Sequence, residues 1–349
     1  MKRVLYLLVG MLTISLAACD VHEWPNLPER VAFHLRLHYE TEMTEWHHFY
    51  NDVEVVEQGL GESYDNHLKT GQIRYVIRAY PSMEKLRSVA DYTQEFVFAK
   101  DIAAGYDHEV TLDLPAGSYD IMVWSDLMQF RSDNPFHDAT NFAEIQLQGD
   151  HVGNSDYRDA FRGTNHITLV SDYVERLPDT LDITMQRPLA KFEFVTNDVD
   201  EFIVKEQTRL EAKSRAEGIQ EPNTRVVLED YRVVFYYIGF MPDTYSMLTD
   251  KPVDSATGMQ FETTLRHLSD TEASMGFDYI FVNGSETITT LQVGIYDKEG
   301  TQLSLTEPLS VPLRRNHHTI LKGMFLMTEA SGGVTINPDY EGDHNIIIP

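Results

Sequence analysis

Apolar and polar residues alternate strictly near the start of the chain. Five apolar residues occupy every second position, namely Val31, Phe33, Leu35, Leu37 and Tyr39. A period of two is typical of a β-strand that buries one face. The same alternation returns over residues 73–79, 110–114 and 181–185. These repeated short runs predict an all-β, largely antiparallel protein.

A turn signal follows the run over residues 110–114. Pro115, Ala116, Gly117 and Ser118 separate Leu114 from a second apolar run over residues 119–124. A short loop containing Gly between two such runs predicts a β-hairpin. Trp124 lies within the second run, and we expect it in the core rather than in a ligand platform.

The strand pattern stops and restarts near the middle of the chain. Gln186, Arg187 and Pro188 interrupt it, and Ala190, Phe192 and Phe194 begin a new alternation. Further strand-like runs cover residues 225–240, 279–282, 287–296, 319–327 and 334–336. Because a single core seldom grows past about 250 to 300 residues, the break predicts two β-sandwich domains, 29–186 and 187–349.

One helix is predicted directly after the new strand. Asp198 and Glu201 have the spacing of a capping box. The helix would end near Gly218 and cross over between strands. Its apolar face is predicted to carry Val199, Phe202, Ile203 and Leu210.

The first residues have the pattern of a secretory signal. Lys2 and Arg3 precede an apolar run over residues 4–16, which is shorter than the roughly 20 residues of a spanning helix. Small residues lead into Cys19, which is the only cysteine. We therefore expect a signal peptide over 1–18 and lipidation of Cys19. The alternative is an ordinary cleavage site beside an incidental cysteine.

Composition narrows the classes of partner. Lys and Arg number 28 against 55 Asp and Glu, which gives a formal net charge of −27. A surface this acidic repels phosphate backbones and anionic headgroups, so nucleic acid is not an expected partner. Membrane attachment would then depend on acyl chains at Cys19, joined to the body by a tether over 19–28. Trp24 lies in this tether and would be free to stack on a neighbouring surface.

No catalytic motif occurs in the chain. A nucleophile elbow, a zinc-protease helix motif and a phosphate-binding loop are all missing from the sequence. We therefore predict a protein that is not an enzyme and has no cofactor. Glu54, Glu57 and Glu62 are too ordinary within an acidic chain to define a catalytic pair, and they are interpreted as solvated surface.

Two histidine pairs and one acidic segment are the candidate metal sites in the sequence. His47–His48 and His317–His318 are adjacent in predicted strands, where neighbours point to opposite faces, so we expect exposed or hydrogen-bonded rings. Trp46 beside the first pair could alternatively suggest a sugar platform. The acidic segment over 337–343 resembles a calcium loop, but Ile348 stands where the closing Glu should be. No metal site is predicted.

Five segments are found together in this chain. They are the lipobox at Cys19, the tether CDVHEWP, LPAGSYDIMVWSD over 114–126, RPLAKFEF over 187–194 and the ending GDHNIIIP. With them, the chain resembles the minor fimbrial anchor lipoproteins of Bacteroidales type V pili. The resemblance covers nearly the whole chain, and its motifs are structural.

That resemblance implies two tandem transthyretin-like β-sandwich domains, an outer-membrane lipid anchor and assembly with fimbrial subunits by strand exchange. Subunits of this kind that polymerise lose their first strand to an arginine-specific protease. Here Arg30 precedes the first strand and Arg36 lies inside it. Retention of the N-terminus, and thus an anchor or accessory role, is the simpler expectation. A surface lipoprotein or tip adhesin that binds a glycan or a host protein is the alternative.

Overall fold

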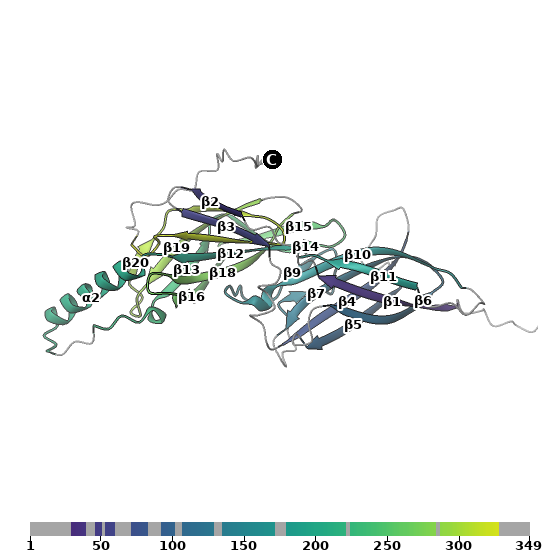
Figure 1. The fold of residues 1–349 in the computed structure, drawn as a ribbon, viewed down its shortest axis with the longest axis horizontal. Coiled ribbons are helices and arrows are strands. Elements are labelled where there is room, and N and C mark those ends of the chain that lie inside the picture. The colour runs from purple at the N-terminus through teal and green to yellow at the C-terminus, as the bar shows by residue number, and fades with distance from the viewer. Residues whose placement is uncertain are drawn as a thin grey trace, which may run out of the picture.

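The computed structural model of the protein describes residues 29–39, 46–50, 53–59, 71–82, 92–101, 107–128, 135–171, 179–220, 224–283 and 287–327, with the backbone alone for 46–50 and 53–59. Strands dominate these residues, and α2 (Val199–Ala216) is the one α-helix among them. The expectation of a mostly β protein with one helix is confirmed. Figure 1 shows an elongated molecule with α2 at one end.

The first half of the chain forms two sheets around one core. The smaller sheet has the order β11 (Asp179–Met185), β1 (Arg30–Tyr39), β6 (His108–Pro115). The larger has the order β10 (Ala160–Leu169), β7 (Gly117–Met128), β4 (Gln72–Pro81), β5 (Gln94–Asp101). The four predicted alternating runs are all strands here. Trp124 has no exposed surface, as expected of a core residue.

The predicted hairpin over residues 110–124 is wrong. A turn does separate β6 from β7, but β6 pairs with β1 and β7 pairs with β4 and β10. The turn therefore carries the chain from one sheet to the other. Tyr119 stabilises it, because its hydroxyl donates a hydrogen bond of 3.0 Å to the carbonyl of Pro115.

The second half forms another pair of sheets around a separate core cluster. One is six-stranded: β17 (Arg266–His267), β18 (Ala273–Phe281), β12 (Leu189–Thr196), β22 (His317–Gly323), β3 (Val53–Gly59), β2 (Trp46–Tyr50). The other contains β16 (Gln260–Thr264), β13 (Arg232–Tyr237), β19 (Thr287–Tyr296) and β20 (Gln302–Leu305), with β21 (Leu309–Leu313) also on β19. Phe192 and Phe194 of β12 are fully buried in this core.

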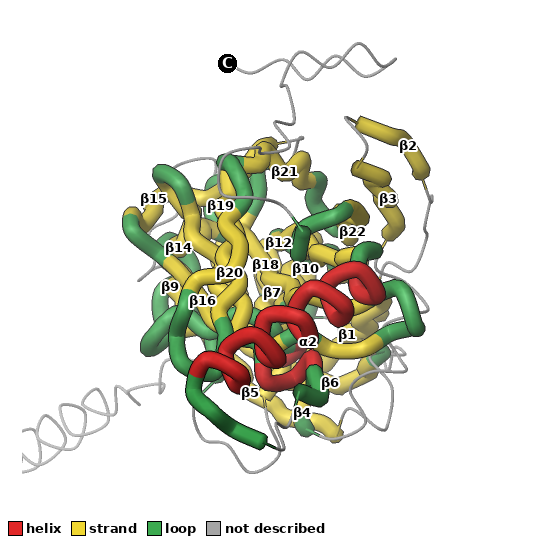
Figure 2. Tube along the Cα trace, turned by 90° about the vertical axis from the view of Figure 1, so that its left-hand side faces the viewer, coloured by secondary structure: helices red, strands yellow, loops and turns green. Residues whose placement is uncertain are grey.

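A hairpin from the first half belongs to a sheet of the second half. β3 pairs antiparallel with β22, from Glu54 opposite Lys322 to Gly59 opposite His317, and β2 pairs with β3. Figure 2 shows both strands beside β22. The sequence boundary between 186 and 187 stays a prediction, and this hairpin is an element from one side of it that pairs on the other.

Helix α2 connects β12 to β13 and ends before Gly218, whose φ of 75° suits a glycine after a helix. The predicted capping box is wrong, because the carboxylate of Asp198 caps no helical N–H. It instead accepts hydrogen bonds from the backbone N–H groups of Leu326 at 3.1 Å and Met327 at 2.8 Å. Of the predicted apolar face, Val199 and Phe202 are buried, and Ile203 packs against the core.

Strand β18 is buried on both faces and touches both cores. Met275 and Ile280 belong to the second core cluster, whereas Phe277 and Tyr279 belong to the first. A register shift opposite Phe194 and Val195 leaves Met275 unmatched and changes which face odd-numbered residues occupy. Gly276 stands at this bulge with a φ of 138°.

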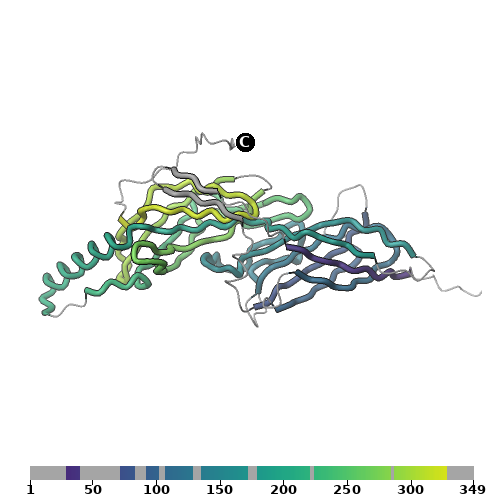
Figure 3. The backbone as a smooth tube through the Cα atoms, viewed as in Figure 1, coloured from purple at the N-terminus to yellow at the C-terminus, as the bar shows by residue number. Residues whose placement is uncertain are grey.

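A small sheet also joins the two halves. Its order is β15 (Lys251–Thr257), β14 (Phe240–Ser246), β9 (Ile145–Leu147), β8 (His137–Asp138). The central contact pairs Thr244 with Gln146 and Tyr245 with Ile145. Figure 3 shows the chain passing between the two halves at this region. The halves are thus joined by backbone hydrogen bonds as well as by side chains.

Candidate assembly site

Strand β1 is the middle strand of the smaller sheet of the first half. It pairs in parallel with β11, for example Leu35 with Leu181, and antiparallel with β6. Phe33, Leu35 and Leu37 have no exposed surface. Removing β1 would therefore leave two unpaired strand edges and an uncovered apolar core between them.

The outward side of β1 carries basic residues that face carboxylates on both neighbours. Arg36 lies 3.7 Å from Glu109 of β6 and 3.8 Å from Asp182 of β11. His38 lies 3.2 Å from Asp182 as well. These groups are exposed, so each ion pair contributes about 0–1 kcal/mol to stability. The buried apolar side chains on the inner side therefore contribute most to holding β1 in the sheet.

A buried polar cluster lies where the two halves meet. Asp278 of β18 has no exposed surface and accepts hydrogen bonds from Arg158, from His151 at 2.8 Å and from Tyr237 at 2.5 Å. Arg158 ends the 3₁₀ helix η4 (Asp156–Arg158) of the first half. Burial raises the pKa of Asp278, but the Arg158 charge and these hydrogen bonds outweigh it and lower the pKa overall.

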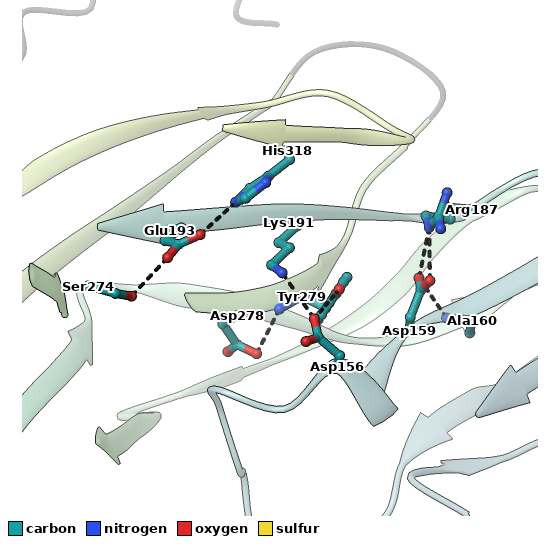
Figure 4. Close-up of polar contacts among 10 residues, drawn as sticks. All are labelled: Asp156, Asp159, Ala160, Arg187, Lys191, Glu193, Ser274, Asp278, Tyr279 and His318. Atoms are coloured by element: carbon teal, nitrogen blue, oxygen red, sulfur yellow. Dashed lines mark hydrogen bonds and ion pairs between the residues drawn. The ribbon is translucent and has the colours of Figure 1, made fainter. Parts of the chain in front are cut away.

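A second group of contacts surrounds Lys191 of β12. Its ammonium lies 3.0 Å from Asp156 and 3.9 Å from the centre of the Phe277 ring. Tyr279 donates a hydrogen bond of 2.8 Å to the same carboxylate (Figure 4). The charge of Lys191 is thus balanced by a carboxylate and an aromatic face at a site with little solvent.

Arg187, from the predicted domain boundary, is also a buried junction residue. Its guanidinium donates to Asp159 at 2.9 and 3.1 Å (Figure 4). It also donates to Asn316 at 3.0 Å. It also covers the Phe161 ring at 4.4 Å. A residue that looked like a linker by sequence therefore ties η4 and β10 to the turn before β22.

Asp250 joins two further strands and the turn before β22 at the junction. It pairs with Arg162 of β10 at 2.7 Å and with Arg315 at 3.0 Å, and it accepts a hydrogen bond from Tyr245 of β14. The carboxylates of the junction are thus held by cations. Such an arrangement suits fixed relative placement of the two halves rather than proton transfer.

Several residues singled out from the sequence lie outside the described residues. Cys19, Trp24, Glu62 and the segment 337–343 are among them, as are the side chains of Trp46, His47, His48, Glu54 and Glu57. The second histidine pair matches its expectation. His317 contacts the Arg315 carbonyl at 2.8 Å, and His318 lies 3.3 Å from Glu193.

Sequence reasoning missed the junction cluster. The available signal was a charged residue inside an apolar run, as with Asp278 in the run 275–282 and with Lys191 between Ala190 and Phe192. Among the described residues, no group of three or more His, Cys, Asp or Glu side chains has metal-binding geometry. No described helix is long and apolar enough to span a membrane.

Comparison with known protein families assigns the chain to one of them. The model of the family of unknown function DUF6562 matches residues 28–349. The chain belongs to this family. No curated protein sequence matches it.

Solved structures give likenesses at low identity. The fimbrial anchor protein Mfa2 from Porphyromonas gingivalis is 10% identical, with a TM-score of 0.35 over 79% of this chain and 82% of that one. The tip fimbrial protein Mfa3 from the same organism is 9% identical, with a TM-score of 0.38 over 84% and 94%. A candidate adhesin from Bacteroides thetaiotaomicron is 9% identical, with a TM-score of 0.43 over 81% of each chain.

Proposed function

We propose that this DUF6562 protein is an outer-membrane lipoprotein that acts as an anchor or accessory subunit of a type V fimbrium. In this proposal a signal peptide over 1–18 is removed and Cys19 is acylated. A tether over 19–28 then leads to two transthyretin-like domains, 29–186 and 187–349. Fimbrial subunits join by β-strand exchange, and the protein is not an enzyme.

The central position of β1 is the observation that supports this role. The tether enters the body directly through β1, which is paired on both sides and fully buried at Phe33, Leu35 and Leu37. A pull on the lipidated end therefore loads two ladders of backbone hydrogen bonds in addition to apolar packing. A strand held this way suits permanent attachment of the body to the membrane.

The buried ion pairs of the junction add to this support. A load that enters at β1 must pass to the second half if subunits attach there. Arg158, Asp278, Arg187 and Asp159 lie at that passage and have at most 3% exposed surface. Desolvated, hydrogen-bonded charges resist separation because either partner alone would be costly to bury.

The lipid anchor is tested by replacing the thiol. Cys19→Ser should give a soluble or uncleaved product, whereas Val21→Ala is the matched control and should partition with the wild type. Phase separation in detergent followed by intact mass measurement distinguishes these products. A processed Ser variant that still enters the detergent phase would place the anchor elsewhere.

Retention of β1 is tested on the mature protein. Mass spectrometry of the cell-bound form should find an acylated Cys19 peptide continuous with residues 31–39. A mature N-terminus at Leu37, directly after Arg36, would instead make the protein a polymerising subunit and contradict the anchor role.

A further inference from the structure

The six-stranded sheet ends in a strand without a partner on its outer side. β22 pairs with β3 and β3 pairs with β2, and within the described part of the chain no strand follows β2. The outer N–H and C=O groups of an edge strand can pair with another chain. Each free edge of the molecule therefore needs either protection or a partner.

The other edge strands carry recognisable protection. Charges or proline occur in those of more than four residues, namely β5, β6, β10, β11, β15, β16 and β21, with Lys100, Glu109, Arg162, Asp182, Pro252, Glu262 and Pro312 as examples. β8 and β17 have two residues each. β20 has four residues, and its Ser304 donates a hydrogen bond of 3.1 Å to the Phe325 carbonyl.

Strand β2 has none of these features. Its sequence, WHHFY, contains no Lys, Arg, Asp, Glu or Pro and includes three aromatic residues. Aromatic residues favour strand structure and stabilise cross-strand pairs. Five residues without charge or proline form an edge suited to pairing rather than an edge that avoids it.

We propose that β2 is an acceptor edge, to which an extended segment of another fimbrial subunit adds as a further antiparallel strand. This inference rests on the proposed assembly function. The acceptor edge at β2 is separate from β1, because β2 lies on a sheet of the second half (Figure 2). Antiparallel addition continues the direction of the β2–β3 and β3–β22 pairs.

Charge determines which segment this edge accepts. The chain has a formal net charge of −27, and β3 contributes Glu54 and Glu57 beside the edge. An approaching acidic strand is repelled by this field, whereas a basic one is attracted. The same field opposes pairing with a second copy of this chain. The occupant is therefore an apolar strand with neutral or basic polar positions.

Binding of a model strand to the full chain tests the proposal. The probe is the capped peptide KVTVKVTVK, and its acidic counterpart EVTVEVTVE is the matched control. Hydrogen exchange should show new protection over residues 46–50 with the basic peptide and little with the acidic one. Phe49→Pro should weaken binding about tenfold, because it removes a ladder hydrogen bond and bends the strand.

A second variant covers the case in which the proline change unfolds the hairpin. Phe49→Lys keeps the backbone N–H donor. It should weaken binding of the basic peptide severalfold through like-charge repulsion. Val97→Lys on β5, at a residue 58% exposed, should leave binding unchanged.

Three results would overturn the proposal. Equal protection by both peptides would show that charge does not select the bound strand. Protection centred on β5 would show that the acceptor edge is β5 and not β2. Residues 46–50 already protected in the free protein would indicate another occupant: a second copy if the protein is a dimer, or the segment 328–349 if it is a monomer. A Cys19 that carries no lipid in the mature protein would contradict the anchor role, but it would not change the outcome of these peptide-binding measurements.

Discussion

Arg158 and Asp278 form a buried ion pair that joins the two halves of the molecule across 120 positions of sequence. The guanidinium comes from η4 and the carboxylate from β18, the strand shared by both cores. Neither side chain has more than 3% exposed surface. The pair is therefore a structural element whose loss should be felt by both halves.

Asp278→Asn should destabilise the protein by about 3–5 kcal/mol, because it leaves the charge of Arg158 buried without a counter-ion. Urea unfolding followed by far-ultraviolet circular dichroism measures this change. The matched control is Asp270→Asn at an exposed position, expected within about 0.5 kcal/mol of wild type. Equal effects of the two changes would contradict a structural role for the pair.

Leu35→Ala should cost about 2–5 kcal/mol, since Leu35 has no exposed surface and truncation leaves a cavity beside β1. Leu268→Ala, at a residue 46% exposed, should cost much less. Thermal unfolding compares the two. Local hydrogen exchange should also speed up over residues 31–39 in the first variant, and unchanged exchange there would argue against a tightly held β1.

Acid should weaken the protein through Glu193. Burial raises its pKa, but hydrogen bonds from His318 and Ser274 and the nearby charges outweigh it, so the pKa is about 2 rather than 4.5. The stability linked to this carboxylate is fully present above pH 4.5 and is lost as the pH falls toward 2, by up to about 3 kcal/mol.

His318 acts in the same direction. Burial lowers the pKa of its ring below 6.5, so the unfolded chain takes up the proton first as the pH falls. Glu193→Gln should flatten the part of the urea-midpoint profile between pH 4.5 and 2. Glu262→Gln, with a half-exposed side chain on β16, is the control and should not flatten it.

Gly276→Ala should destabilise the β18 bulge by about 1–3 kcal/mol. The added methyl would lie 2.7 Å from Thr263 and 3.1 Å from Phe235, at a φ that side chains rarely adopt. Gly239→Ala meets no atom within 4 Å at a φ of 102° and so measures backbone strain alone. Calorimetric melting of both variants separates the clash from the strain.

Local pattern predicted the strands that bury one face. Residues 31–39 alternate and form β1 as expected, with a polar outer side and an apolar inner side. β18 could not be predicted equally well, because it packs against both cores and its bulge at Gly276 breaks the period. A strand buried on two sides has no polar face to mark it.

Long-range partners explain the remaining errors. Asp198 has the spacing of a helix cap, but its carboxylate binds backbone N–H groups of residues 326 and 327. The turn at Pro115 has the residue types of a hairpin loop, but β6 pairs with β1 and not with β7. The charged residues of the junction likewise find their partners only when η4 packs against β18. No local window contains both members of these pairs.

The pairing of β3 with β22 also determines the order in which the protein can mature. Synthesis delivers residues 53–59 well before their partner strand, residues 317–323. Closing such a distant contact is slow, because most of the chain must first be brought into place. Until then the hairpin has no sheet to join. The completed edge at β2 therefore exists only on molecules whose second half has folded, so that a partial chain cannot present it.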